Sequence, residues 1–241
     1  MKQAILFDVD DTLYDMRTPF WRAFEELFGT RFQNLDWKEV YVASRKHSDE
    51  VFEASQKGEM SMEDMYVYRW SKAMEDYGAN IRREEALEFQ RLYQGYQKQI
   101  SMSETIQKML TECVKAQIPL GVITNGPSAH QWNKTRALGL SRWIPDEAVI
   151  VSGDMDMMKP DPRIFFWAEK VLHSLGYQGG RKNCWFVGDT FSTDMAGALE
   201  AGWNTIWFNR RNHQTPEQKV DKIVKTEEEL YQAIVSLIRE Q

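Results

Sequence analysis

Short apolar runs recur along the chain, each bounded by residues that are typical of turns. Runs of about four to eight apolar residues between turn residues favour strands that are buried on both faces of a sheet. The pattern predicts strands at AILF (4–7), LGVIT (120–124), AVIVS (148–152), CWFVG (184–188), NTIWF (204–208) and the shorter KIV (222–224).

Helical patterns lie between these runs. From Ser101, a capping-box spacing to Glu104 leads into an apolar stripe, which predicts a helix that begins there. Asp161 and Pro162 are typical of a helix start, and Gly176 is typical of a helix end. Strands that alternate with helices predict a parallel sheet with helices on both faces.

The stretch from Asp15 to about Lys98 breaks this alternation. It shows no convincing strand pattern, and its apolar spacing predicts amphipathic helices at about 18–28, 36–55, 61–77 and 82–98, with Thr18 and Ser61 as caps. The predicted fold is therefore α/β, a doubly wound, Rossmann-like parallel sheet with an inserted all-helical domain. We expect residues 1–15 and 98–241 to form the α/β domain and residues 16–97 to form the helical one.

Polar side chains follow four of the predicted strands. They are, in chain order, Asp8, Asp10 and Asp11, then Thr124 and Asn125, then Lys159, and finally Asp189 with Asp194. Ligands of open parallel sheets bind beyond the carboxyl ends of the strands. We therefore expect these side chains to converge at one edge of the sheet.

Carboxylates crowded at one edge repel one another unless a cation lies among them. Oxygen ligands favour a hard ion, and a few carboxylates with waters are the usual Mg²⁺ arrangement. A carboxylate that attacks a phosphate dianion faces repulsion of about 1 kcal/mol in water and about 4 kcal/mol at an effective dielectric near 20. Mg²⁺ and Lys159 would reverse that repulsion, so the pattern predicts phosphoryl chemistry at a magnesium site.

These residues resemble the motifs of the haloacid dehalogenase (HAD) superfamily, in the subgroup with a helical cap inserted after the first motif. The resemblance rests on DVDDT (8–12), Thr124 in VITNG, Lys159 in KPDPRIF and GDTFSTD (188–194). It covers most of the α/β part, whereas the helical insertion is similar in placement and helicity only.

The resemblance implies a chemical role for each motif residue. Asp8 would be the nucleophile that forms an aspartyl-phosphate, and Asp10 would act first as acid and then as base. Asp10 must then carry a proton near neutral pH, and we expect neighbouring acids and partial burial to raise its pKa. For Asp11 a loop-capping role competes with a functional one.

The same resemblance implies a set of binding residues. Thr124, Asn125 and Lys159 would bind the phosphate group, while Asp8, Asp189 and the backbone carbonyl of Asp10 would bind Mg²⁺. Asp194 would assist the metal site or orient Lys159, unless it only caps the following helix. Where the helical insertion begins, Tyr14, Arg17 and Trp21 are further candidates beside ordinary structural roles.

These motifs predict a Mg²⁺-dependent phosphatase that acts on a small phosphomonoester, either a nucleoside monophosphate or a sugar phosphate. A phosphomutase shares the whole core and remains an alternative. A dehalogenase needs no Mg²⁺ and lacks the second aspartate of motif one, so Asp10 argues against it. The order of the acidic residues argues against a phosphoacceptor receiver domain, and intact motifs argue against a non-catalytic binding protein.

Composition narrows the choice of partners and location. The 241 residues carry a net charge of −6 and no basic run, which argues against nucleic-acid or anionic-membrane binding. Cys113 and Cys184 are typical of buried thiols in a reducing compartment. The N-terminus does not resemble a signal peptide, and no apolar run is long enough to span a bilayer. We expect a soluble cytoplasmic monomer or homodimer that binds a small phosphorylated molecule.

Overall fold

The computed structural model describes residues 3–51, 54–55 and 58–240 of the chain, which forms two compact units. One unit, called the α/β unit below, comprises Met1–Asp15 and Ser101–Gln241. The other, the helical unit, comprises Met16–Ile100. Among the described residues, no helix combines the length and apolar character that a membrane span requires.

The α/β unit is built on a six-stranded sheet in the order β3-β2-β1-β4-β5-β6. All neighbouring strands run parallel. The strands are β1 (Ala4–Phe7), β2 (Leu120–Thr124), β3 (Val149–Val151), β4 (Cys184–Gly188), β5 (Asn204–Phe208) and β6 (Lys222–Val224). The predicted doubly wound parallel sheet is confirmed, and only the run at 148–152 forms a shorter strand than its apolar letters suggest.

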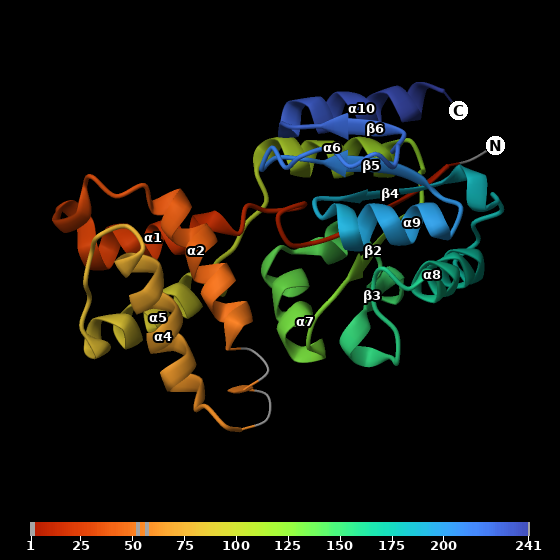
Figure 1. The fold of residues 1–241 in the computed structure, drawn as a ribbon. Helices are drawn as coiled ribbons and strands as arrows, with labels where there is room; N and C mark the ends of the chain where they lie inside the picture. The colour runs from red at the N-terminus through yellow and green to blue at the C-terminus, as the bar shows by residue number, and fades with distance from the viewer. Residues whose placement is uncertain (1–2, 52–53, 56–57, 241) are drawn as a thin grey trace. The chain divides into compact units, whose positions relative to one another are not determined.

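Helices cover both faces of this sheet (Figure 1). They are α6 (Glu104–Lys115), α7 (Ser128–Ala137), α8 (Pro162–Ser174), α9 (Ala196–Glu200) and α10 (Glu227–Arg239). α6 and α10 pack together on one face, and α8 and α9 pack together on the other. Short 3-10 turns occupy Leu140–Arg142, Asp146–Ala148, Ser152–Asp154 and Arg181–Asn183, and one π-helical turn occupies Phe191–Met195.

The start of α6 differs from the prediction. Ser103, not Ser101, caps the helix, and its hydroxyl accepts a hydrogen bond from the backbone N–H of Ile106 at 3.2 Å. The prediction of a Ser101 cap is wrong because two serines stand close together and only Ser103 has the spacing that closes this hydrogen bond. At α8, Asp161 accepts from the N–H of Arg163 at 2.9 Å and Pro162 is the first helical residue, as predicted.

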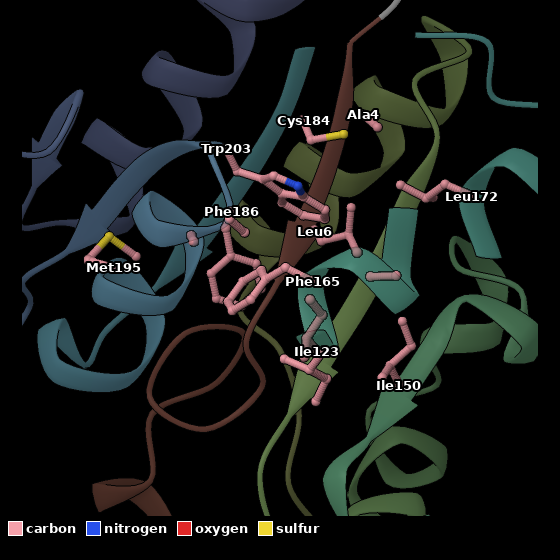
Figure 2. Close-up of a cluster of buried hydrophobic side chains, with 14 of the residues drawn as sticks. Ala4, Leu6, Ile123, Ile150, Phe165, Leu172, Cys184, Phe186, Met195 and Trp203 are labelled. Atoms are coloured by element: carbon pink, nitrogen blue, oxygen red, sulfur yellow. The ribbon is translucent and has the colours of Figure 1, made fainter. Parts of the chain in front are cut away.

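Aromatic side chains pack α8 against the sheet (Figure 2). Phe165 of α8 meets Phe186 of β4 edge to face, with ring centroids 5.1 Å apart and planes at 84°. It meets Trp203 in the same way at 5.5 Å. Such pairs add stability beyond their buried area, and here they fix β4 just before the chain reaches Asp189.

The helical unit contains α1 (Arg17–Phe28), a 3-10 turn (Gly29–Phe32), α2 (Trp37–Glu50), α4 (Met62–Glu75) and α5 (Arg83–Gln97). Its core is aromatic: Phe20 contacts the rings of Tyr41, Trp70 and Phe89 at centroid distances of 5.4, 5.7 and 5.2 Å. Among its described residues no strand occurs. Residues 52 and 53, within the predicted helix at 36–55, lie outside the described residues.

The helix starts of this unit bear out one predicted cap and contradict another. Ser61 caps α4, since its hydroxyl accepts from the backbone N–H of Asp64 at 3.1 Å. Thr18 does not cap α1, which already begins at Arg17 and has no side-chain cap. Pro19 fits this start because the first helical turn leaves its N–H groups without intrahelical partners.

Candidate active site

Asp8 lies at the centre of the sheet edge where the parallel strands end. It follows β1 directly, and β1 pairs with β2 on one side and β4 on the other. The Asp8 backbone N–H donates to the carbonyl oxygen of Val187 at 2.8 Å, which extends the ladder by one residue. The side chain is buried, with 6% of its residue surface exposed. A central strand therefore fixes Asp8 where ligands of such sheets bind.

Lys159 reaches this aspartate from a loop 151 positions later in the chain. Its ammonium group donates to Asp8 Oδ1 at 2.6 Å and forms an ion pair with Asp194 Oδ1 at 2.7 Å. Only 3% of Lys159 is exposed. Burial acts to lower the pKa of Lys159, but the carboxylates of Asp194 and Asp8 outweigh burial and raise it above its ordinary value. A permanent positive charge thus lies against Asp8.

Asn125 fixes the backbone of Lys159. Its side-chain carbonyl accepts from the Lys159 N–H at 2.9 Å, and its amide group donates to the Lys159 carbonyl at 2.8 Å. The buried Thr124, the last residue of β2, precedes it. This pair of hydrogen bonds uses the Asn125 carbonyl and one of its two amide N–H groups, and the predicted phosphate contact of Asn125 stays a prediction.

Three carboxylates converge beside Lys159. Asp8, Asp189 and Asp194 each offer an oxygen, and these atoms lie within 4.8 Å of one another. Burial raises the pKa of Asp8 to about 7, although the Lys159 ammonium opposes the rise. Burial, and then the charges of Asp8 and Asp194, raise the pKa of Asp189 to about 8. A divalent cation would favour the ionised forms, so the all-oxygen donor set fits Mg²⁺.

Asp194 belongs to the π-helical turn that follows β4. Its Oδ2 accepts from the backbone N–H of Thr190 at 2.9 Å. The side chain packs against Gly188, where an added Cβ would lie within 2.5 Å of the Asp194 carboxyl carbon. Its ion pair with Lys159 would allow the predicted orienting role and its nearness to Asp189 the metal-assisting one, and both roles stay predictions.

Asp10 occupies a separate set of contacts. Its Oδ1 accepts from the Tyr14 hydroxyl at 2.6 Å, and its Oδ2 accepts from Lys134 at 2.5 Å and from Gln131 at 3.3 Å. Burial alone would raise the pKa of Asp10, but the Lys134 charge and the hydrogen bonds from Lys134, Tyr14 and Gln131 hold it below its ordinary value. The prediction of a raised pKa is therefore wrong, because it considered the neighbouring acids and not a counter-charge from another element.

Sequence reasoning missed Gln131 and Lys134, although a signal was present. Both side chains lie on α7, three positions apart and therefore on one face of the helix. The buried residues of α7 are Gln131, Lys134 and Thr135, all of them polar. A helix between two buried strands that lacks an apolar stripe directs polar groups inward, and such groups need a polar site to face.

Asp11 is engaged in a contact with the loop after β5. Its backbone adopts a left-handed conformation with φ of 57°, and its carboxylate pairs with Arg211. Arg211 also pairs with Asp15 at 2.5 Å, and Arg210 donates to the Asp11 carbonyl at 3.2 Å. This network favours the structural alternative for Asp11, that of holding the loop after β1.

The flagged residues near the start of the helical unit divide between the two units. Tyr14 belongs to the α/β unit and binds Asp10. Trp21 lies against Trp37 at a centroid distance of 5.0 Å within the helical unit. Arg17 lies over the ring of Tyr41 at 6.0 Å in the same unit. Trp21 therefore has a packing contact, although 37% of it stays exposed.

Comparisons with known proteins agree on one family. The sequence model of one protein family, the haloacid dehalogenase-like hydrolases, matches residues 2–202 of this chain. N-acylneuraminate-9-phosphatase of Homo sapiens is 29% identical over 216 residues, which cover 86% of this chain and 83% of the relative. Glyceraldehyde 3-phosphate phosphatase of Methanopyrus kandleri is 25% identical over 237 residues, covering 92% and 90%.

A solved structure agrees on the fold. The putative HAD-hydrolase YfnB from Bacillus subtilis, in a magnesium-bound crystal form, superposes with a TM-score of 0.63 and 23% sequence identity. The superposition covers 97% of this chain and 98% of that one. At this identity the likeness concerns the fold, an α/β core with inserted helices, and not the reaction.

Proposed function

The chain belongs to the haloacid dehalogenase-like hydrolase family and is a phosphoric monoester hydrolase, and we propose that it hydrolyses a small phosphomonoester through a phosphorylated Asp8. The observation that carries this proposal is the meeting of Asp8, Lys159, Asp189 and Asp194 at one edge of the sheet. A carboxylate nucleophile, a buried ammonium and an acidic metal site are the parts that phosphoryl transfer to a side chain requires.

Asp8 would attack the phosphorus atom and displace the alcohol. Lys159 holds one oxygen of the Asp8 carboxylate at 2.6 Å, so the nucleophile has a fixed orientation. Bound by Asp8, Asp189 and the Asp10 carbonyl, Mg²⁺ would offset the repulsion between the carboxylate and the phosphate dianion. Thr124 and the backbone that follows it would hold the phosphate oxygens.

Asp10 would serve both proton transfers. With its pKa below the ordinary value, it is ionised in the free protein at neutral pH and suits the second step, in which it deprotonates water. An arriving phosphate dianion would raise the pKa of Asp10, because a nearby like charge favours the protonated acid. A proton acquired in this way would go to the leaving alkoxide in the first step.

We propose a substrate class that is supported by the relatives that share most of the chain. Their names specify an N-acylneuraminate 9-phosphate and a glyceraldehyde 3-phosphate ester. Both names describe sugar-type phosphates, which supports a sugar phosphate as the substrate, and both describe hydrolysis and not a mutase reaction. We propose that the helical unit is the cap that excludes water and selects this substrate.

Release of inorganic phosphate from p-nitrophenyl phosphate tests the proposal. We expect activity with Mg²⁺, loss of activity on chelation, and loss in Asp8→Asn; Asp146→Asn, an exposed aspartate of the same unit, is the matched control. Acid-quenched protein should carry one phosphoryl group on Asp8. Inactivity with Mg²⁺ across a panel of sugar phosphates and nucleotides would sink the proposal, and conversion of a sugar phosphate to its isomer without free phosphate would identify a mutase.

A further inference from the structure

Arg69 of α4 is a buried charge in the helical unit. Only 8% of the residue is exposed. Among the described residues it takes part in no ion pair, although other basic residues of the same unit do. A buried guanidinium without a carboxylate is costly, because the charge has left water and gained no opposite charge.

The fixed contacts of Arg69 leave part of its hydrogen-bonding capacity unused. Its Nη2 donates at 2.6 Å to the side-chain oxygen of Gln90, which also accepts from Trp70 Nε1 at 2.9 Å. The Nε of Arg69 is sealed from solvent without a hydrogen-bond partner. One neutral oxygen thus serves a group that carries five N–H donors.

Aromatic rings hold the guanidinium in place. The Trp70 ring lies 4.2 Å from the Arg69 carbon Cζ, and the Tyr66 ring lies 5.2 Å from it. The charged or ionisable groups that act most strongly on Arg69 are Tyr93, Arg45, Tyr66 and Tyr41, none of them a carboxylate. Arg45 of α2 is exposed and adds a second positive charge. Burial, reinforced by Arg45, lowers the pKa of Arg69 to about 10, so it stays charged at neutral pH.

Other arginines of the helical unit show that carboxylates are available to it. Arg31 pairs with Glu85, Arg83 with Asp64 at 2.7 Å and Arg91 with Glu88 at 2.6 Å, and all three arginines have side chains that are about half or more exposed. Exposed pairs of this kind contribute little to stability. Arg69, which is buried and would gain more from a carboxylate than these exposed arginines, has none among the described residues.

We propose that the helical unit contains an anion-binding site centred on Arg69, which takes a carboxylate or phosphate group. A planar guanidinium held by an aromatic face and a fixed amide is suited to two-point binding of either group. Arg45 supplies additional positive charge. The anion accepts hydrogen bonds from terminal N–H groups of Arg69 that Gln90 does not use, and it provides the opposite charge that the described residues do not supply.

Thermal unfolding in the absence of Mg²⁺ tests this site with malonate as the probe. Malonate should raise the Tm of the wild-type protein above that in NaCl of equal ionic strength, and Arg69→Met should abolish the rise. In NaCl alone Arg69→Met should unfold at the same or a higher temperature, since it removes an uncompensated buried charge. Arg83→Met, which breaks an exposed ion pair, is the control that keeps the malonate effect.

The proposal is overturned if malonate does not raise the Tm of the wild-type protein. It is also overturned if malonate still raises the Tm of Arg69→Met, because the anion would then bind at the sheet edge. Should Arg69→Met fail to fold, Arg69→Lys keeps the charge without the planar fork and should weaken the malonate effect by about tenfold in apparent affinity. Neither Tm measurement requires enzymatic activity, so the proposed anion site and the proposed phosphatase reaction can be refuted independently.

Kinetics distinguish two sources of the anion. If it is a second acidic group of the substrate, Arg69→Met lowers kcat/KM for a carboxylated phosphomonoester such as 3-phosphoglycerate by about 10- to 100-fold and leaves p-nitrophenyl phosphate unaffected. If it is a free small anion, malonate changes the rate with p-nitrophenyl phosphate in wild type and not in Arg69→Met. Equal losses for both phosphate esters in Arg69→Met would overturn the site in favour of a purely structural arginine.

Discussion

The ammonium group of Lys134 lies 2.5 Å from Oδ2 of Asp10, although the two residues are 124 positions apart in the chain. Lys134 comes from α7, the helix that follows Thr124 and Asn125, and only 5% of it is exposed. Together with Tyr14 and Gln131 it gives both carboxylate oxygens of Asp10 fixed partners. The proposed acid and base is thus oriented by a cation that belongs to none of the four recognised motifs.

Replacing Lys134 with methionine should impair the step that depends on Asp10. We expect kcat for an alkyl phosphate such as glycerol phosphate to fall by about 10- to 100-fold, because general acid–base catalysis depends on the position and pKa of the acid. The fall for p-nitrophenyl phosphate should be smaller, since its leaving group needs little protonation. Steady-state kinetics on the two esters measure the difference.

The control for this substitution lies on the same helix. Arg136 is exposed on α7, and Arg136→Met should leave both rates within about twofold of wild type. An equal loss for both esters in Lys134→Met would assign Lys134 to the water step that both esters share, or to the fold of the site, and unchanged rates would contradict the prediction.

The raised pKa values of Asp8 and Asp189 predict that protons and Mg²⁺ compete. Without metal, burial raises the pKa of Asp8 to about 7 and that of Asp189 to about 8, from an ordinary value of 3.8. The apparent Mg²⁺ affinity should therefore rise with pH and level off only well above pH 8, once Asp189 has also lost its proton. Isothermal titration calorimetry in buffers of different ionisation enthalpy should show proton release below that pH.

The same two groups set a pH dependence of stability without metal. Because their folded-state pKa values are raised, the folded protein binds more protons than the unfolded chain from about pH 4 to about pH 8, so their stabilising contribution shrinks as pH rises through that window. In Asp189→Asn the decline in the free energy of unfolding should be shallower. Urea titrations in EDTA measure it, and equal slopes in both proteins would contradict the assignment.

The sequence predicted most of the α/β unit because its strands are short apolar runs with clear ends. It also predicted which loops carry Asp8, Thr124, Lys159 and Asp189, since carboxyl ends of parallel strands share one edge. It could not predict the counter-charge on Asp10, because the burial of Lys134 is a tertiary property. Helix starts failed at Ser101 and Thr18 for a similar reason: several residues could cap, and packing selects one.

Asn125→Ala should loosen Lys159 without touching its side chain. The substitution removes both hydrogen bonds that hold the Lys159 backbone, and we expect the free energy of unfolding to fall by about 1–3 kcal/mol. The rate should fall by about tenfold or more, since the ammonium would no longer be fixed on Asp8. Urea unfolding and kcat measure the two effects. Asn133→Ala, at an exposed site of α7, should change neither; a stable, fully active Asn125→Ala would refute the argument.

Gly188→Ala should damage the site through a single methyl group. The new Cβ would lie within 2.5 Å of the Asp194 carboxyl carbon, closer than carbon atoms approach, so Asp194 must move. That movement would withdraw one carboxylate from Lys159 and from the metal-binding group, and we expect kcat to fall by about 100-fold.

Gly95→Ala is the matched control, because Gly95 lies within α5 with nothing within 4 Å of an added Cβ. It should add about 0.5–1 kcal/mol of stability and leave kcat unchanged. If Gly188→Ala keeps full activity and Mg²⁺ affinity, Asp194 holds neither Lys159 nor the metal in the reacting protein.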